Sequence, residues 1–122
     1  MAMEPSDVHL YTYRAHCIRA YDADTITVDV DLGMHVTLHG ITLRLSRIDA
    51  PEVRGEERPE GLAARDFIRA LVVGRDLLIQ TFKDAKGKYG RYIAEVWIDH
   101  GEGLTNVSDY LVENGHAEYV DY

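Results

Sequence analysis

The sequence lacks several features that would place it in a special class of protein. Among its 122 residues there is one cysteine, Cys17, so an internal disulfide is excluded. No apolar run reaches the length of a membrane span, and we expect no membrane partner. The first residues, MAMEPSDV, lack the apolar segment of a secretory signal. The chain is therefore expected in the cytoplasm, or outside the cell after removal of a signal.

An excess of basic residues is also missing. Asp and Glu number 21 against 13 Lys and Arg, which gives a formal net charge of −8. This balance argues against broad electrostatic binding to nucleic acid, although a local basic site remains compatible with it. The length fits a single domain, which we place at residues 9–122 after a flexible lead-in of residues 1–8.

Alternating apolar and polar residues predict strands in the first half of the chain. The pattern is clearest at 25–32 and continues through 36–45, where His39–Gly40 is expected to form a kink or turn. Residues 11–20 are rich in aromatic and β-compatible residues and predict an earlier strand. After Leu45 the apolar Ile48 lies on the opposite phase, so a bulge or bend is expected at Ser46–Arg47.

The second half is predicted to hold two helices and two further strands. The apolar spacing of residues 62–71 predicts a helix, with Pro59 in its first turn and Gly74 at its end. The other expected elements are strands at 77–82 and 92–98 and a short helix at 104–111, capped by Asn106 and ended by Gly115. Five strands and two helices in this order predict a mainly β, α+β fold: an OB-type barrel, with an open antiparallel sheet as the alternative.

Three polar clusters lie near the ends of predicted strands. If 25–32 and 36–45 pair as a hairpin, Asp24 lies near Asp49. Two converging carboxylates without a nearby Cys or His favour a hard cation, with room left for waters and a substrate phosphate. The clusters are YDADT, with Asp22 and Asp24; RLSRIDAPE, with Arg44, Asp49 and Glu52; and KGKYGR, with Lys86, Lys88, Tyr89 and Arg91.

The arginines and the glutamate of these clusters suggest what such a metal would assist. A planar guanidinium can hold two oxygens of a phosphate at once, as Arg44 and Arg91 would. Glu52 can accept a proton from an attacking water or orient it. Together these residues predict metal-assisted hydrolysis of a phosphodiester.

Each cluster alone also has an ordinary structural explanation. Asp-x-Asp at a strand start is common turn chemistry, and IDAPE resembles a strand end with a proline-fixed turn. KGKYGR resembles a solvated hairpin loop. The arginines at 47, 54 and 58 lie among several glutamates and are expected to form surface ion pairs worth little. The three clusters in this order favour the chemical interpretation.

The order DADT, RLSRIDAPE and KYGR resembles the staphylococcal nuclease (thermonuclease) family, over about residues 19–117. The resemblance implies an OB-fold, calcium-dependent nuclease that cleaves DNA and RNA to 3′-phosphate products. It also implies that Ca²⁺ is bound by Asp24, Asp49 and the backbone carbonyl of Ala50, with Asp22 just behind them.

The resemblance also assigns the substrate-contacting residues. Glu52 falls on the position that activates or orients the attacking water, and Arg44 and Arg91 fall on the two phosphate-binding arginines. The remaining substrate contacts that it implies are Lys88 and Tyr89 on a terminal phosphate, and Tyr119 and Tyr122 as candidates for base stacking.

Two other classes of function fit the same chain. One is a non-catalytic module that uses the barrel to bind nucleic acid or a protein partner. The other is an assembly role in which the acidic surface meets a basic partner. All charged positions of the three motifs are present, which favours the nuclease.

Overall fold

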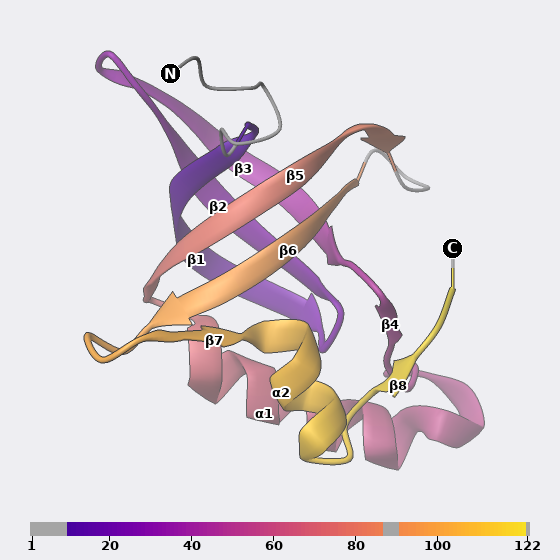
Figure 1. Ribbon diagram of the computed structural model, residues 1–122. Coiled ribbons are helices and arrows are strands. Elements are labelled where there is room, and N and C mark those ends of the chain that lie inside the picture. The colour runs from indigo at the N-terminus through magenta and orange to yellow at the C-terminus, as the bar shows by residue number, and fades with distance from the viewer. Residues whose placement is uncertain (1–9, 87–90, 122) are drawn as a thin grey trace.

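Five strands close into a barrel, and two helices lie below it in the view of Figure 1. The structure is a computed structural model that describes residues 10–86 and 91–121. Neighbouring strands run antiparallel in the order β3-β2-β1-β5-β6, and a parallel pairing of β3 with β6 closes the barrel. This confirms the predicted OB-type fold. The barrel strands are β1 (Thr12–Asp22), β2 (Thr25–Gly33), β3 (Val36–Leu45), β5 (Asp76–Lys86) and β6 (Tyr92–Asp99).

Both predicted helices are present, and three short strands were not foreseen. Pro59 stands in the first turn of the first helix, as expected. Leu104, predicted in the second helix, instead belongs to a strand that pairs with the end of β6. The helix begins later because Asn106 is extended and its side chain caps the N–H of Asp109. These elements are β4 (Ile48–Asp49), a 3₁₀ turn η2 (Gly55–Glu57), α1 (Arg58–Val72), β7 (Leu104–Asn106), α2 (Val107–Glu113) and β8 (Glu118–Tyr119).

The core fills the barrel and the space between the barrel and the helices. Alternate residues of the strands point inward, which explains the period-two pattern of the sequence. From α1, the fully buried Ala64, Ile68 and Val72 cover the barrel at helical spacing. Within the described part of the chain, no helix is long and apolar enough to cross a membrane. Fully buried strand residues include Cys17, Ile26, Val28, Leu43, Leu45, Ile79 and Val96.

The predicted bends in the third strand are confirmed. Gly40 has a φ of 70° inside β3, and its N–H donates to Asp29 Oδ1 at 3.0 Å. At the end of β3 Arg47 has a φ of 67°, which is uncommon for a residue with a side chain. The chain turns there and re-enters extended structure as β4, which pairs with β8. This turn places Asp49 beside the start of β2.

Candidate functional site

A cleft of about 590 Å³ gathers most of the predicted site residues. It lies where the turn from β1 to β2, the end of β3, the start of β6 and the segment after β4 meet. These elements are brought together by the β2–β3 hairpin, in which Thr25 pairs with Arg44, and by the β3–β6 pairing that closes the barrel. The cleft is lined by Tyr21, Asp22, Asp24, Thr25, Arg44, Asp49, Ala50, Glu52, Arg54 and Arg91.

Asp24 joins the two carboxylate segments. Its side chain is 9% exposed, and its Oδ2 accepts a hydrogen bond from the N–H of Ala50 at 3.0 Å. Arg44 bridges the two acids, with Nη1 3.3 Å from Asp24 Oδ2 and Nη2 3.3 Å from Asp49 Oδ1. The expectation that the hairpin brings Asp24 towards Asp49 is therefore confirmed. Asp49 itself is 65% exposed and faces the open side of the cleft.

These donors fit a hard, hydrated cation better than a closed metal cage. Among the described residues, no group of three or more His, Cys, Asp or Glu side chains converges as a metal site. Asp24 and Asp49 offer carboxylate oxygens, and Ala50 lines the same cleft. Such a small oxygen set suits Ca²⁺ with waters and substrate completing its shell, and it disfavours zinc.

The surroundings of Asp22 also change its pKa. Burial, followed by hydrogen bonding and charge repulsion from Asp24, raises the pKa of Asp22 to about 7. Asp22 also accepts the N–H of Asp24 at 3.2 Å, a contact that shapes the turn between β1 and β2. Asp22 therefore holds a proton more readily than an exposed aspartate does.

Two arginines face the cleft from neighbouring strands. Arg44 is 12% exposed and held by the two acids and by the carbonyl of Leu45 at 3.1 Å. Arg91 begins the chain segment that enters β6, and its Nη1 donates to Thr25 Oγ1 at 3.3 Å. Thr25 is the last residue of the DADT motif, so this contact ties two of the predicted clusters together. Arg44 and Arg91 both line the cleft.

Glu52 owes its position to a glycine on α1. Gly61 is buried, and a methyl group built on it would overlap the carbonyl group of Glu52 and approach Val53 N to 2.9 Å. The backbone of the Glu52 segment therefore lies directly on the helix, while the Glu52 side chain is exposed on the cleft wall. The sequence analysis did not assign Gly61 a role, although a glycine inside a helical pattern is a signal of close packing.

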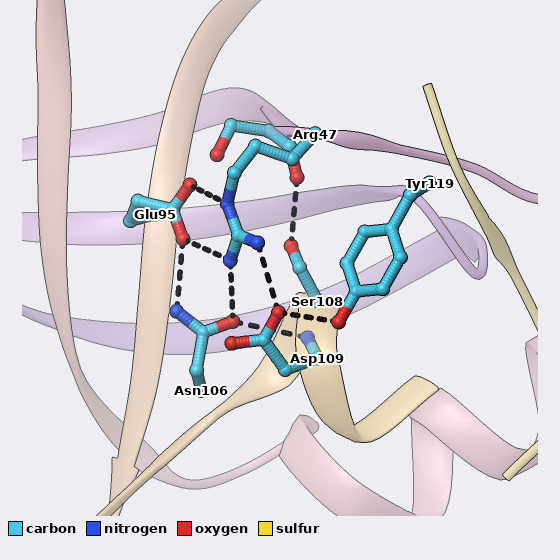
Figure 2. A network of polar contacts seen from close by, with 7 residues as sticks. Arg47, Glu95, Asn106, Ser108, Asp109 and Tyr119 are labelled. Atoms are coloured by element: carbon cyan, nitrogen blue, oxygen red, sulfur yellow. Dashed lines mark hydrogen bonds and ion pairs between the residues drawn. The ribbon is translucent and has the colours of Figure 1, made fainter. Parts of the chain in front are cut away.

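Behind the cleft, Arg47 anchors the bend that precedes Asp49 (Figure 2). Its Nε and Nη2 donate to the two carboxylate oxygens of Glu95 at 2.9 and 2.8 Å, and its Nη1 donates to Asp109 Oδ1 at 2.8 Å. The Asn106 side chain donates to Glu95 Oε1 at 2.8 Å and accepts the backbone N–H of Asp109 at 3.1 Å. The predicted surface pairing of Arg47 with nearby glutamates is wrong, because the positive φ of the bend turns its side chain towards β6 and α2.

The backbone of the same bend is also fixed. Ser46 N–H donates to the carbonyl of Ala94 at 2.9 Å, and the Ser46 carbonyl accepts from the Ser108 hydroxyl at 3.0 Å. The Arg47 carbonyl accepts the N–H of Val120 at 2.9 Å. The strand that presents Asp49 is therefore held by both backbone and side-chain contacts.

Two cleft residues were missed by the sequence analysis. Tyr21 and Arg54 line the wall next to Glu52, and Arg54 Nη2 donates to the Tyr21 hydroxyl at 3.1 Å. Their only sequence signal is adjacency: Tyr21 precedes DADT and Arg54 follows Glu52 by two positions. The surface pairing expected for Arg54 is wrong, since its side chain donates to the Tyr21 phenol and forms no ion pair with any described side chain.

Tyr119 is the one other predicted substrate contact that the described part of the chain includes, and it does not line this cleft. Lys88, Tyr89 and Tyr122 lie outside the described residues. Tyr119 lies in β8, where its hydroxyl donates to Asp109 Oδ1 at 2.8 Å and Arg47 lies over its ring at 5.9 Å. Its ring is more than half exposed. Base stacking by these tyrosines and phosphate contact by Lys88 and Tyr89 stay predictions.

Comparison with known proteins identifies the family of the chain. The family model described as staphylococcal nuclease homologue matches residues 42–122. Thermonucleases of Staphylococcus hyicus and Staphylococcus intermedius are each 31% identical, over 120 and 107 residues, which are 96% and 85% of this chain and 64% and 58% of theirs. An uncharacterized protein of Methanocaldococcus jannaschii is 24% identical over 132 residues, covering 91% of this chain and 60% of its own. The chain thus spans about three fifths of the length of these relatives.

Proposed function

Because the chain belongs to the staphylococcal nuclease homologue family, we propose that it is a calcium-dependent nuclease that hydrolyses phosphodiester bonds of DNA, RNA or both. The observation that carries the proposal is one cleft lined by three aspartates, a glutamate and three arginines from distant parts of the sequence. The similarity to thermonucleases supports the reaction class. By analogy with the family, the products would carry a 3′-phosphate.

Calcium would be held by Asp24, Asp49 and the carbonyl of Ala50, with Asp22 behind them. When bound there, Ca²⁺ would polarise the scissile phosphate and offset the charge of the acids. The residues of the chain position the carboxylates that would hold the ion. Arg44 keeps the two acids at fixed separation, and Ala50 N–H holds Asp24 in its rotamer.

The arginines and Glu52 would act on the reacting phosphate. Arg44 lies in β3 and Arg91 directly precedes β6, and both line the cleft, so a phosphate bound there would receive hydrogen bonds from both guanidinium groups. These donors are fixed before the substrate arrives, so they stabilise the charge that builds on the phosphate oxygens. Glu52 would orient a water for in-line attack and accept its proton, because its segment is seated on α1 at the edge of the same cleft.

The test is cleavage of a single-stranded DNA and an RNA with calcium or with chelator. Glu52→Gln and Arg91→Met should each lower turnover by about a hundredfold or more, since removal of one preorganised group typically costs that much. Glu113→Gln and Arg75→Met are matched controls, because both are exposed and neither lines the cleft. These controls should cleave at the wild-type rate.

The result also decides between the proposal and its alternative. Cleavage by the folded protein that needs calcium and collapses only in the cleft variants supports the nuclease. Absence of cleavage with any divalent ion, while the protein is folded, would refute it. The non-catalytic module would then be the function to test, by measuring binding of the same labelled nucleic acids.

A further inference from the structure

The cleft extends beyond the residues needed for the reaction. The residues that line its volume of about 590 Å³ include Tyr21 and Arg54, which have no part in the proposed chemistry. Tyr21 is the last residue but one of β1, directly before Asp22, and Arg54 lies in the segment between β4 and η2. They are 33 positions apart in sequence, yet joined by a 3.1 Å hydrogen bond. The pair therefore forms a built feature of the wall.

Arg54 is placed as an anion-binding group. Among the described side chains no carboxylate lies within ion-pair distance of it, although the chain carries an excess of acids and glutamates flank it in sequence. By contrast, Arg44 in the same cleft is held by two acids. Arg54 donates one N–H to a neutral phenol, which orients the guanidinium and leaves its other donors for a ligand.

Tyr21 adds an aromatic surface to this cation. Its side chain is 55% exposed, although a tyrosine at the end of a barrel strand would gain by burial. Nucleic-acid bases stack on exposed aromatic rings, and phosphates bind guanidinium groups. One ring and one arginine side by side therefore match one nucleotide.

Resting on the nuclease function proposed above, we propose that Tyr21 and Arg54 form a subsite for the nucleotide next to the scissile phosphodiester. Arg54 binds the phosphate of the neighbouring link, and the Tyr21 ring stacks on the base. The subsite sets a preference for a strand that continues past the cleaved bond. The subsite does not discriminate between bases, because every base has a face that can stack on an aromatic ring.

A pair of substrates separates this subsite from the reaction centre. Thymidine 5′-(4-nitrophenyl phosphate) has one nucleoside, whereas an oligothymidylate of eight residues fills the neighbouring position. Arg54→Met and Tyr21→Leu should lower kcat/KM for the oligonucleotide by roughly 5- to 100-fold, the range for loss of one stacked base. They should leave kcat/KM for the nitrophenyl diester within about twofold. Tyr21→Phe keeps the ring and should retain most of the activity on the oligonucleotide.

Arg58→Met is the control for loss of charge. Arg58 begins α1, bonds to the carbonyl of Val53 at 3.1 Å and does not line the cleft. It should leave both substrates unaffected. The salt dependence gives a second readout: Arg54→Met should reduce the slope of log kcat/KM against log salt by about 0.7 for a single strand, and Arg58→Met should not.

The outcomes distinguish this inference from the function on which it rests. The subsite would be overturned if Arg54→Met and Tyr21→Leu, with wild-type melting curves, lost kcat/KM equally on both substrates or lost none on either. If the wild type cleaves neither substrate, the nuclease proposal fails. In that case binding of a fluorescent oligothymidylate decides the subsite: weaker binding by Arg54→Met and Tyr21→Leu, but not by Arg58→Met, supports it, and unchanged binding overturns it.

Discussion

The substitution Gly61→Ala tests how the fold positions Glu52, because helix propensity and packing change the stability of the protein in opposite directions. Gly61 lies inside α1 and has an ordinary helical backbone. Alanine in a helix interior is favoured over glycine by about 1 kcal/mol. On helix propensity alone, the substitution would stabilise the protein and leave activity unchanged.

The packing of Glu52 on the helix reverses that expectation. The added methyl group would overlap the Glu52 carbonyl, so the Glu52–Val53 segment must move away from α1 by roughly 1 Å. Overpacking of this kind costs about 1–3 kcal/mol, which cancels or exceeds the gain in propensity. A misplacement of about 1 Å at a reacting group can lower the rate about a hundredfold. We therefore expect a net loss of about 0–2 kcal/mol in stability and a large loss of turnover.

The assay combines the free energy of unfolding with kcat on a single-stranded DNA. Ala63→Gly is the matched control, because Ala63 is exposed on the same helix and reports propensity alone. It should lose about 1 kcal/mol of stability and no activity. If Gly61 acts through Glu52, the double variant Gly61→Ala/Glu52→Gln should be little slower than Glu52→Gln. A Gly61→Ala protein that is more stable than wild type and fully active would refute this reasoning.

Three further predictions concern the scaffold. Arg47→Met should lower the free energy of unfolding, measured by denaturant titration, by about 2–3 kcal/mol. This is less than the roughly 3–5 kcal/mol typical of a broken buried pair, because Arg47 is partly exposed. The double variant Arg47→Met/Glu95→Leu should recover much of the lost stability, because it leaves no unpaired Glu95 carboxylate. Hydrogen bonding to Arg47 lowers the pKa of Asp109, so that carboxylate stabilises the fold above about pH 4, and its contribution is lost as the pH falls through the lowered pKa. The acid transition of Asp109→Asn should therefore be less steep than that of wild type; equal slopes would contradict this. Burial raises the pKa of Cys17 to about 11, so at pH 8 a thiol reagent should label it only through unfolding, and labelling at the rate of the denatured chain would show the residue to be accessible.

Much of the barrel was predictable because its signals are local. Residues 25–32 alternate since one face of β2 fills the barrel, and the phase change at Ile48 reported the bend at Arg47 correctly. The two-residue strands β4 and β8 are too short to show a period, so they left no such signal. Leu104 was misplaced in a helix because a three-residue strand and the first turn of a helix look alike in apolar spacing.

In the candidate site too, the features with a local sequence signal were predicted and those that depend on long-range contacts were not. The motifs that end strands carried the acids and arginines, and the hairpin that joins them follows from short-range pairing. The contacts of Arg47 join residues 48 and 62 positions apart, so no local pattern predicts them. Gly61 and the pair formed by Tyr21 and Arg54 also act through long-range packing. What the sequence missed is how these distant segments support the cleft.

The cleft also offers an explanation of how an acidic chain could bind the anionic substrate proposed for it. The net charge of −8 disfavours binding over the surface as a whole. Three arginines nevertheless face one cleft, next to acids that a calcium ion would offset. The substrate would therefore be drawn to this cleft and not to the general surface, and binding should weaken when calcium is removed.

The most direct test of this account is the cleavage rate of a single-stranded DNA measured across a calcium titration, for wild type, Asp49→Asn and Arg91→Met. If Asp49 binds the metal and Arg91 the phosphate, Asp49→Asn should need much more calcium to reach its half-maximal rate. Arg91→Met should reach half its rate at the wild-type calcium concentration but with a maximum about a hundredfold lower. A rate that is independent of calcium, or an Asp49→Asn curve that matches wild type, would contradict the proposed site.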